Sequence, residues 1–202
     1  MSLISNVLRE KIEAAVKAKG YKWFENGDYN LNIVGVRNSE TGNAITNKFD
    51  DYITVSYKVD GKLQFEIFEA TTDPGLHWAE NLLNKDGVAI LVPGQYRGSH
   101  AIGPHKNYTA LRQQKPLKVY RDKDKDKEYD LIEENIQEGI YYINIHRANA
   151  WGTSSQIDKW SAGCQVIANN QNFDRLMELA HKAKDIWGNS FTYTLIESKD
   201  LN

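Results

Sequence analysis

Apolar residues recur at the spacing of one helical face in two stretches of this chain, one near each end. The first stretch covers residues 5–19 and is followed by Gly20, a suitable end for a helix. The second covers residues 171–187. We therefore predict a helix near the N-terminus, with one face packed on the core, and a second helix shortly before the C-terminus.

Between these helices, short apolar or alternating runs predict β-strands. Asp60-Gly61 separates two such runs and is a strong signal for a β-hairpin. The stretch from residue 95 to residue 112 is only weakly periodic and is interpreted as a loop. The predicted strands cover residues 30–37, 52–59, 63–70, 87–92, 117–121, 139–146 and 190–197.

This order of elements predicts a β-rich α+β fold. No repeat, low-complexity tract or Gly/Ser linker divides the chain. We therefore expect a single domain over residues 29–202, preceded by a helical N-terminal extension over residues 1–28.

Composition narrows the classes of function. The chain has 202 residues, 41% of them hydrophobic, which is enough for one sizeable core. Its formal net charge of −2 provides no basic field for binding nucleic acid. One cysteine excludes an intramolecular disulfide and a multi-cysteine zinc site. No apolar run is long enough to be a transmembrane segment.

The single cysteine, Cys164, is the strongest candidate for chemistry. It follows a turn of small residues, Ser161-Ala162-Gly163, and His146 stands upstream at the end of an apolar run. A thiol is a nucleophile as its thiolate, and a nearby imidazole is the usual means of forming one. This pattern is typical of a cysteine acyl-transfer site.

The segment from His146 to Cys164 resembles the signature of the L,D-transpeptidase catalytic domain, a family of cysteine enzymes that act on bacterial peptidoglycan. That signature is a histidine followed, after a gap, by Ser/Thr-His-Gly-Cys. The fourteen residues between His146 and Ser161 fit the gap. Ala162 stands where the family has its second histidine. The helix and strand predicted after Cys164 also resemble the end of that domain.

The resemblance implies a sandwich-like core with the site at one edge. Cys164 would be the nucleophile and His146 the general base, oriented by the carbonyl of Arg147. The backbone N–H groups of Cys164 and Gly163 would hold the oxyanion. The substrate would be a peptidoglycan stem peptide, cleaved through a thioester without a cofactor.

Four residues are candidates for binding the substrate. Ser161 belongs to the signature, and Trp151 lies in the polar loop before Cys164, where an aromatic side chain could wall a groove. Arg97 and His105 lie in the predicted loop of residues 95–112 and could bind a carboxylate. No carboxylate or third histidine stands near His105 at the spacing of metal ligands, so we expect no metal there.

Acidic residues alternate with lysines from Asp122 onwards, and they match positions of a calcium-binding loop. Lys127 stands where that loop requires glycine, and strands rather than helices are predicted on either side. We therefore interpret the stretch from Asp122 to Glu133 as a solvated hairpin and expect no metal in the protein.

Charged residues run through the first nineteen positions, so we expect no signal peptide. A wall enzyme made in the cytoplasm without a leader would reach the wall by phage release or virion delivery. This favours a monomeric lysin that hydrolyses its substrate over a transpeptidase that builds cross-links.

Three alternatives remain. A lone cysteine is often a small buried hydrophobic residue, and the His–Cys pair could be fortuitous. The chain could instead be a non-catalytic cell-wall-binding module that retains the enzyme scaffold, which Ala162 favours. It could also be a virion structural protein with the same scaffold.

Overall fold

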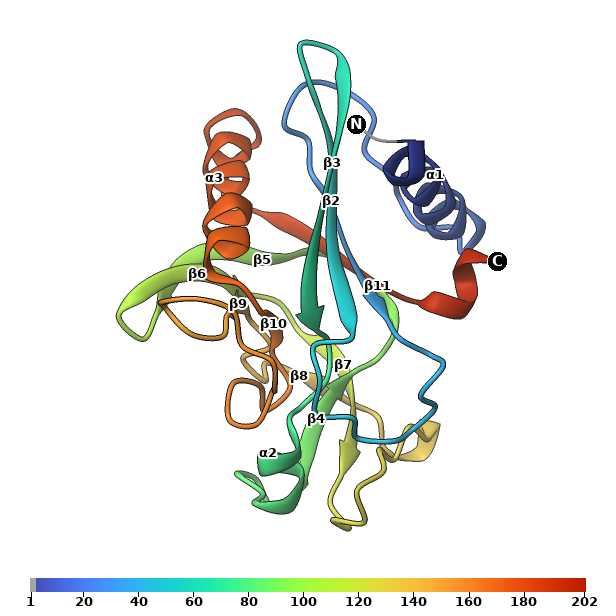
Figure 1. Cartoon of the computed structure of the whole chain (residues 1–202), viewed down its shortest axis with the longest axis vertical. Helices are drawn as coiled ribbons and strands as arrows, with labels where there is room; N and C mark the ends of the chain where they lie inside the picture. The colour runs from blue at the N-terminus through green and yellow to red at the C-terminus, as the bar shows by residue number, and fades with distance from the viewer. Residues whose placement is uncertain (1–2) are drawn as a thin grey trace.

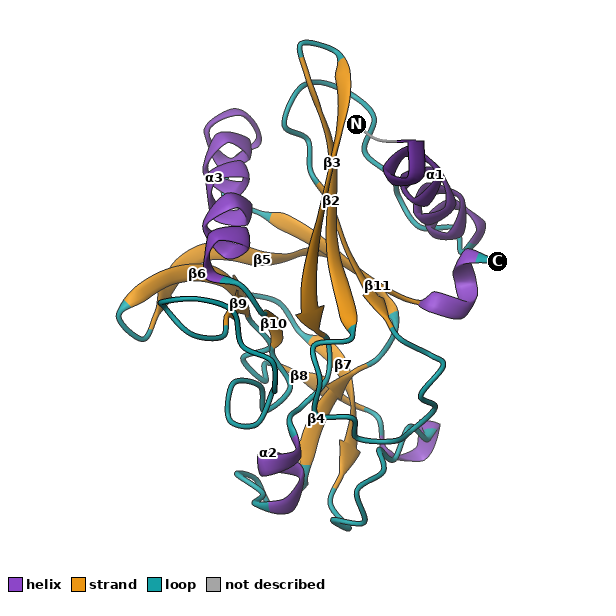
Figure 2. Ribbon diagram, in the orientation of Figure 1, coloured by secondary structure: helices purple, strands orange, loops and turns teal. Residues whose placement is uncertain are grey.

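The computed structural model describes residues 3–202 and has both helices and strands around a β-rich core. Eight strands form a closed barrel in the order β1-β11-β5-β6-β9-β10-β3-β2 (Figure 2). These strands are β1 (Asn32–Arg37), β2 (Asp51–Val59), β3 (Lys62–Thr71), β5 (Gly94–His105), β6 (Tyr108–Gln113), β9 (Ile145–Arg147), β10 (Gln165–Ile167) and β11 (Phe191–Glu197). The predicted α+β class is confirmed, whereas the sandwich-like core stays a prediction.

A smaller antiparallel sheet has the order β4-β7-β8 and lies below the barrel in Figure 1. Its strands are β4 (Val88–Leu91), β7 (Leu117–Asp122) and β8 (Gln137–Gly139). The helices are α1 (Leu3–Ala18), α2 (Leu76–Glu80) and α3 (Asn170–Trp187), with short 3-10 helices η1 (Glu133–Asn135) and η2 (Ser198–Leu201). Within residues 3–202 no helix is both long enough and apolar enough to span a membrane.

The two long helices lie on either side of the β2–β3 hairpin (Figure 1). On α1, Ile12 and Val16 pack against Val34 of β1 and Ile196 of β11. On α3, buried apolar residues follow one face and join the main core, and burying a large apolar side chain contributes roughly 1.5–3 kcal/mol. These residues are Phe173, Leu176, Met177, Leu179, Ala180 and Ala183.

Both ends of α3 have recognisable signals. The side chain of Asn169 caps the helix by accepting a hydrogen bond from the N–H of Asn172 at 3.1 Å. The helix ends at Gly188, whose φ of +87° suits a residue without a side chain. Because α3 starts shortly after β10, the cap also sets the path of the chain beyond Cys164.

The structure corrects two sequence predictions. Residues 95–112 are not a loop: β5 and β6 form a long hairpin that turns at Lys106, whose φ is +53°. The mixed polar, glycine and proline residues of β5 hid its strand character. The continuous strand predicted over 139–146 is also wrong, because β8 ends at Gly139 and β9 starts at Ile145. Between them Tyr142 has a φ of +59°, which no strand residue adopts.

Candidate functional site

The turn before Cys164 is held by its own side chains. Ser161 is fully buried; its Oγ accepts a hydrogen bond from the N–H of Gly163 (3.1 Å) and donates one to the carbonyl of Cys164 (2.8 Å). Gly163 has a φ of +128°, and an added Cβ would lie 2.3 Å from the carbonyl oxygen of Ala89. Only glycine fits this position without displacing backbone.

The N–H of Gly163 already has a hydrogen-bond acceptor, so it is not available as one of the two expected oxyanion donors. Its hydrogen bond to Ser161 makes it part of the turn, whereas no residue in the described range accepts a hydrogen bond from the N–H of Cys164. The hydroxyl of Ser161 is buried in the same turn. Substrate binding by Ser161 stays a prediction.

Distant parts of the chain anchor this turn. The N–H of Gly75 donates to the carbonyl of Ser161 at 2.8 Å. The side chain of Gln165 donates to the carbonyl of Thr72 at 3.2 Å and accepts from the hydroxyl of Tyr193 at 2.8 Å. The turn that carries Cys164 is therefore fixed to the end of β3 and to the barrel interior.

The thiol of Cys164 donates a hydrogen bond to the carbonyl of Tyr142 at 3.2 Å. Burial of the sulfur raises the pKa of Cys164 to about 11, and the backbone N–H of Asn144 and the charge of Lys106 offset only part of this. Tyr142 is 62% exposed in a left-handed conformation, a genuine outlier for a bulky residue. Such strain clusters at functional sites.

His146 is buried on β9, beside the strand that follows Cys164. The parallel pairing of β9 and β10 places Val166 opposite His146. Nδ1 of His146 lies 2.7 Å from the carbonyl oxygen of Arg147, the contact that the family resemblance implied. Because a carbonyl only accepts, Nδ1 carries the proton and Nε2 presents its lone pair.

Burial is the main reason why the pKa of His146 is lowered to about 3. In the described part of the chain, His146 Nδ1 pairs with the carbonyl of Arg147, and the thiol of Cys164 pairs with the carbonyl of Tyr142 and the N–H of Asn144, so no hydrogen bond joins the two side chains. At neutral pH the site therefore contains a neutral imidazole and a neutral thiol.

The ring of His105, at the end of β5, stacks on the ring of His146 with centroids 4.5 Å apart. The edge of His105 also meets Tyr108, and the guanidinium of Arg147 lies 4.3 Å from the centroid of the Tyr108 ring. Tyr108 in turn contacts Phe173 of α3. This row of rings holds the imidazole of His146 against the core.

A cavity of about 270 Å³ lies next to the turn. Ala162 and Tyr142 line one part of it, and Trp78, Tyr141 and Arg121 line others. Small-molecule and peptide sites commonly combine aromatic walls with a few polar groups in this way. Ala162 makes this side of the turn apolar.

The other two predicted residues lie apart from this arrangement. Trp151 is 95% exposed on the loop before Cys164. Arg97 stacks over Phe24 and lines a separate cavity of about 400 Å³ with Phe24, Lys115 and Trp187. Substrate binding by Trp151 and Arg97 stays a prediction.

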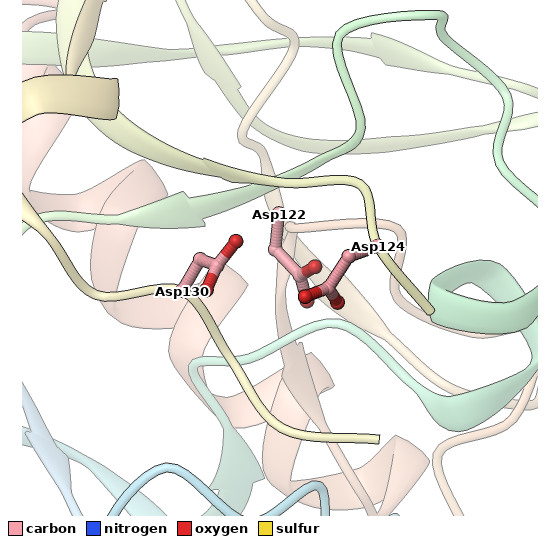
Figure 3. Close-up of side chains that lie close together, drawn as sticks. All are labelled: Asp122, Asp124 and Asp130. Carbon is pink, nitrogen blue, oxygen red and sulfur yellow. The ribbon is translucent and has the colours of Figure 1, made fainter. Parts of the chain in front are cut away.

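Asp122, Asp124 and Asp130 bring their carboxylates together, with one oxygen from each within 4.8 Å of the others (Figure 3). Burial and the neighbouring charges of Asp130 and Asp124 raise the pKa of Asp122 to about 6. Oxygens of this kind could ligate a hard cation. The acidic segment connects the antiparallel strands β7 and β8, and the expectation of no metal stays a prediction.

Sequence reasoning missed Tyr142, Asn144 and Gln113. Gln113 accepts hydrogen bonds from the N–H groups of Tyr141 and Ile143, and so supports the irregular segment that faces the thiol. Asn144 contacts both Gln113 and His105. None of these residues has a local signature, because each acts through partners distant in sequence.

Comparisons with protein-family models, curated proteins and solved structures find no match for this chain.

Proposed function

We propose that the protein is a cysteine-dependent hydrolase or acyltransferase that acts on stem peptides of bacterial peptidoglycan, with an L,D-transpeptidase-like, sandwich-like core. It would act at the cell wall as a monomer and without a cofactor. The observation that carries the proposal is the 2.7 Å contact between His146 Nδ1 and the carbonyl of Arg147. That contact leaves the lone pair of Nε2 available as a proton acceptor, on the strand beside the one that follows the single cysteine.

The reaction starts when the thiol of Cys164 changes its hydrogen-bond acceptor from the carbonyl of Tyr142 to Nε2 of His146. His146 takes the thiol proton while the sulfur attacks a carbonyl carbon of the stem peptide. The C–S bond forms, the peptide C–N bond breaks, and the departing amine takes the proton from His146. Water then attacks the thioester carbonyl while His146 takes its proton; the C–S bond breaks, the sulfur of Cys164 regains that proton from His146, and the acid product leaves. An amine in place of water would give transpeptidation.

The pKa shifts of the two side chains support transfer of the proton during attack rather than a preformed thiolate–imidazolium pair. The pKa of Cys164 is raised to about 11 and that of His146 is lowered to about 3, so both groups are neutral in the free protein. The free N–H of Cys164 is the proposed oxyanion donor, and the loss of such a donor typically costs roughly 10²–10³ in rate.

A non-catalytic cell-wall-binding protein is the second candidate. The hydrogen bond from the thiol to Tyr142 and the high pKa of Cys164 favour it, because a satisfied, protonated thiol is unreactive. Ala162 favours it as well. The cavity beside Tyr142 would then bind wall peptides without turnover.

Digestion of purified wall fragments, followed by mass spectrometry of the products, separates the two candidates. We expect new stem-peptide ends with the parent protein and none with Cys164→Ala. His146→Ala should slow turnover by roughly 10²–10⁴, the usual contribution of a general base. Circular dichroism would check that both variants remain folded.

Products that form equally fast with Cys164→Ala would remove Cys164 as the nucleophile. Saturable binding of wall fragments with no products, from parent and variants alike, would establish the binding protein instead. Adding an amine acceptor to the active enzyme decides between hydrolysis and transpeptidation by the mass of the product.

A further inference from the structure

Arg121 is a buried cation without a counter-ion in the described chain. It lies on β7 and is 9% exposed. None of the ion pairs formed among residues 3–202 includes it. A charged side chain is almost never buried unless it is paired, because removing a charge from water is costly. The unpaired charge of Arg121 therefore requires an explanation.

Two neutral acceptors and one aromatic ring hold the guanidinium of Arg121. Its Nη1 donates to the carbonyl of Gly87 at 3.1 Å, and its Nε donates to Oε1 of Gln137 at 3.0 Å. Its Cζ lies 4.5 Å from the centroid of the Tyr141 ring. A guanidinium has five N–H donors, so the others, including both on Nη2, have no acceptor in the described part of the chain.

These contacts fix the position of the guanidinium. Gly87 has a φ of +95°, and a Cβ added there would collide with the backbone of Asp122, so no other residue fits. The N–H of Tyr141 donates to Oε1 of Gln113 at 3.0 Å, which holds the backbone beneath the ring. Arg121 is therefore preorganised, and an anion that pairs with it has little conformational freedom to remove.

The guanidinium borders the cavity beside the Cys164 turn. Arg121 lines this cavity of about 270 Å³ together with Gly87 and Tyr141, the residues that it contacts. The cavity is also lined by Ala162, two residues before Cys164, and by Tyr142, whose carbonyl accepts the hydrogen bond from the thiol. A ligand that fills the cavity therefore touches both Arg121 and the segments that hold the thiol.

The lining of this cavity favours a ligand with one negative charge. Arg121 carries the only formal charge among the described residues that line it, and the other side chains are aromatic, aliphatic or the amide of Asn84. A planar carboxylate matches the planar donor fork of arginine, and its single charge is neutralised by one guanidinium. A phosphate dianion would bring a second charge that no other lining residue neutralises.

A second cavity, of about 480 Å³, adjoins Arg121 where Gln137 lies. Three acidic residues and one lysine line it: Asp86, Asp130, Glu134 and Lys123. The acidic side chains repel an anion there, so a carboxylate that pairs with Arg121 approaches from the cavity beside Cys164.

We propose that Arg121 binds a carboxylate of the substrate peptide in the cavity beside the Cys164 turn and so positions the peptide at the thiol. The carboxylate accepts hydrogen bonds from the unpaired N–H groups of Arg121 and supplies the counter-ion. The apolar part of the residue that bears it packs against Tyr142 and Ala162. That the peptide is a wall stem peptide rests on the proposed function, whereas the pairing with a carboxylate follows from the contacts of Arg121.

Peptide binding tests the ligand without relying on turnover. The protein for this test is Cys164→Ala, and the probe is a synthetic stem tetrapeptide that has a C-terminal and a side-chain carboxylate. Calorimetry would compare the free acid with two forms in which one or the other carboxylate is converted to an amide. We expect one amidation to weaken binding by roughly 10- to 100-fold and the other to have little effect, which identifies the carboxylate that is bound.

Two substitutions of Arg121 test the partner of that carboxylate. Added to Cys164→Ala, Arg121→Gln should weaken binding of the free acid by roughly 10- to 100-fold and abolish the difference between acid and amide. Arg121→Lys keeps the charge without the donor fork and should recover part of that difference. Circular dichroism would check that both variants remain folded, and the comparison of acid with amide in Cys164→Ala alone needs neither variant.

Lys123→Gln is the matched control. It removes an equal charge two residues away, from a side chain that lines only the second cavity, and should leave all three affinities unchanged. The proposal is overturned if no form of the peptide binds, if acid and amides bind equally, or if Lys123→Gln weakens binding as much as Arg121→Gln. A preference for the acid without turnover by the parent protein would contradict only the enzymatic function. Turnover by a protein that binds acid and amides equally would contradict only the role of Arg121.

Discussion

At the scale of single residues, the thiol of Cys164 is hydrogen-bonded and its pKa is raised, so it stays protonated at neutral pH. Its sulfur donates to the carbonyl of Tyr142, a residue in a left-handed conformation. The hydroxyl of Ser161 and the N–H of Gly163 are hydrogen-bonded within the turn itself. The proposed reaction therefore requires the thiol to change its hydrogen-bond partner when a ligand binds.

Alkylation of the free thiol should reflect this protection. Because burial raises the pKa of Cys164 to about 11, we expect the alkylation rate of the parent protein to increase about tenfold per pH unit and to keep rising past the ordinary thiol value of 9.0. Iodoacetamide kinetics measured by mass spectrometry would check it. A rate that levels off near neutral pH would mean that a thiolate–imidazolium pair already exists in the free protein.

At the scale of elements, two strands and one helix position the candidate base and nucleophile. β9 presents His146, β10 follows Cys164 in parallel register with it, and α3 begins directly after β10. The β5–β6 hairpin brings His105 from another part of the barrel onto His146. The start of α3 is therefore structurally coupled to the site.

Removing the cap of α3 should destabilise the protein. Asn169→Ala loses the bond to the N–H of Asn172 and should lower the free energy of unfolding by about 1 kcal/mol. Urea unfolding monitored by circular dichroism would measure the change. Asn169→Asp keeps a capping oxygen and should recover most of the lost stability. If Asn169→Asp were as unstable as Asn169→Ala, the hydrogen bond from Asn169 to Thr153 would contribute more stability than the cap.

At the scale of the whole molecule, buried polar groups connect the barrel to the irregular segments. His100 is fully buried on β5 and its Nε2 lies 2.8 Å from the carbonyl oxygen of Ile143, in the segment that faces the thiol. Burial lowers the pKa of His100 to about 4, so its ring is neutral in the folded protein. In the unfolded chain the same ring would gain a proton near pH 6.5.

His100 should therefore make the folded state sensitive to acid. The unfolded chain binds the proton more tightly, so this contribution to stability is complete above pH 6.5 and is lost as pH falls to about 4. We expect the stability advantage of the parent over His100→Gln to shrink by about 3 kcal/mol across that range. Urea titrations of both proteins at several pH values would measure it, and a constant difference would contradict it.

Residue patterns alone predict most of the regular elements of this protein. The helices at both ends, the β2–β3 hairpin and the strands β4, β7 and β11 have local signals in their apolar spacing and turns. The same patterns misjudge β5 and β6, whose polar, Gly- and Pro-containing residues become strands only through pairing with each other and with β11. They also miss the break at Tyr142, because a tyrosine carries no signal for a left-handed conformation.

The sequence by itself determined which thiol and which imidazole are candidates, since it has one cysteine and a histidine upstream of it at the end of an apolar run. Only the tertiary structure decided their surroundings: the stack of His105 on His146, the carbonyl of Arg147 that sets the tautomer of His146, and the carbonyl of Tyr142 that accepts a hydrogen bond from the thiol. The physical reason is that local propensity depends on neighbours along the chain. Protonation state and hydrogen-bond partner instead depend on neighbours in space, which barrel closure supplies from distant segments.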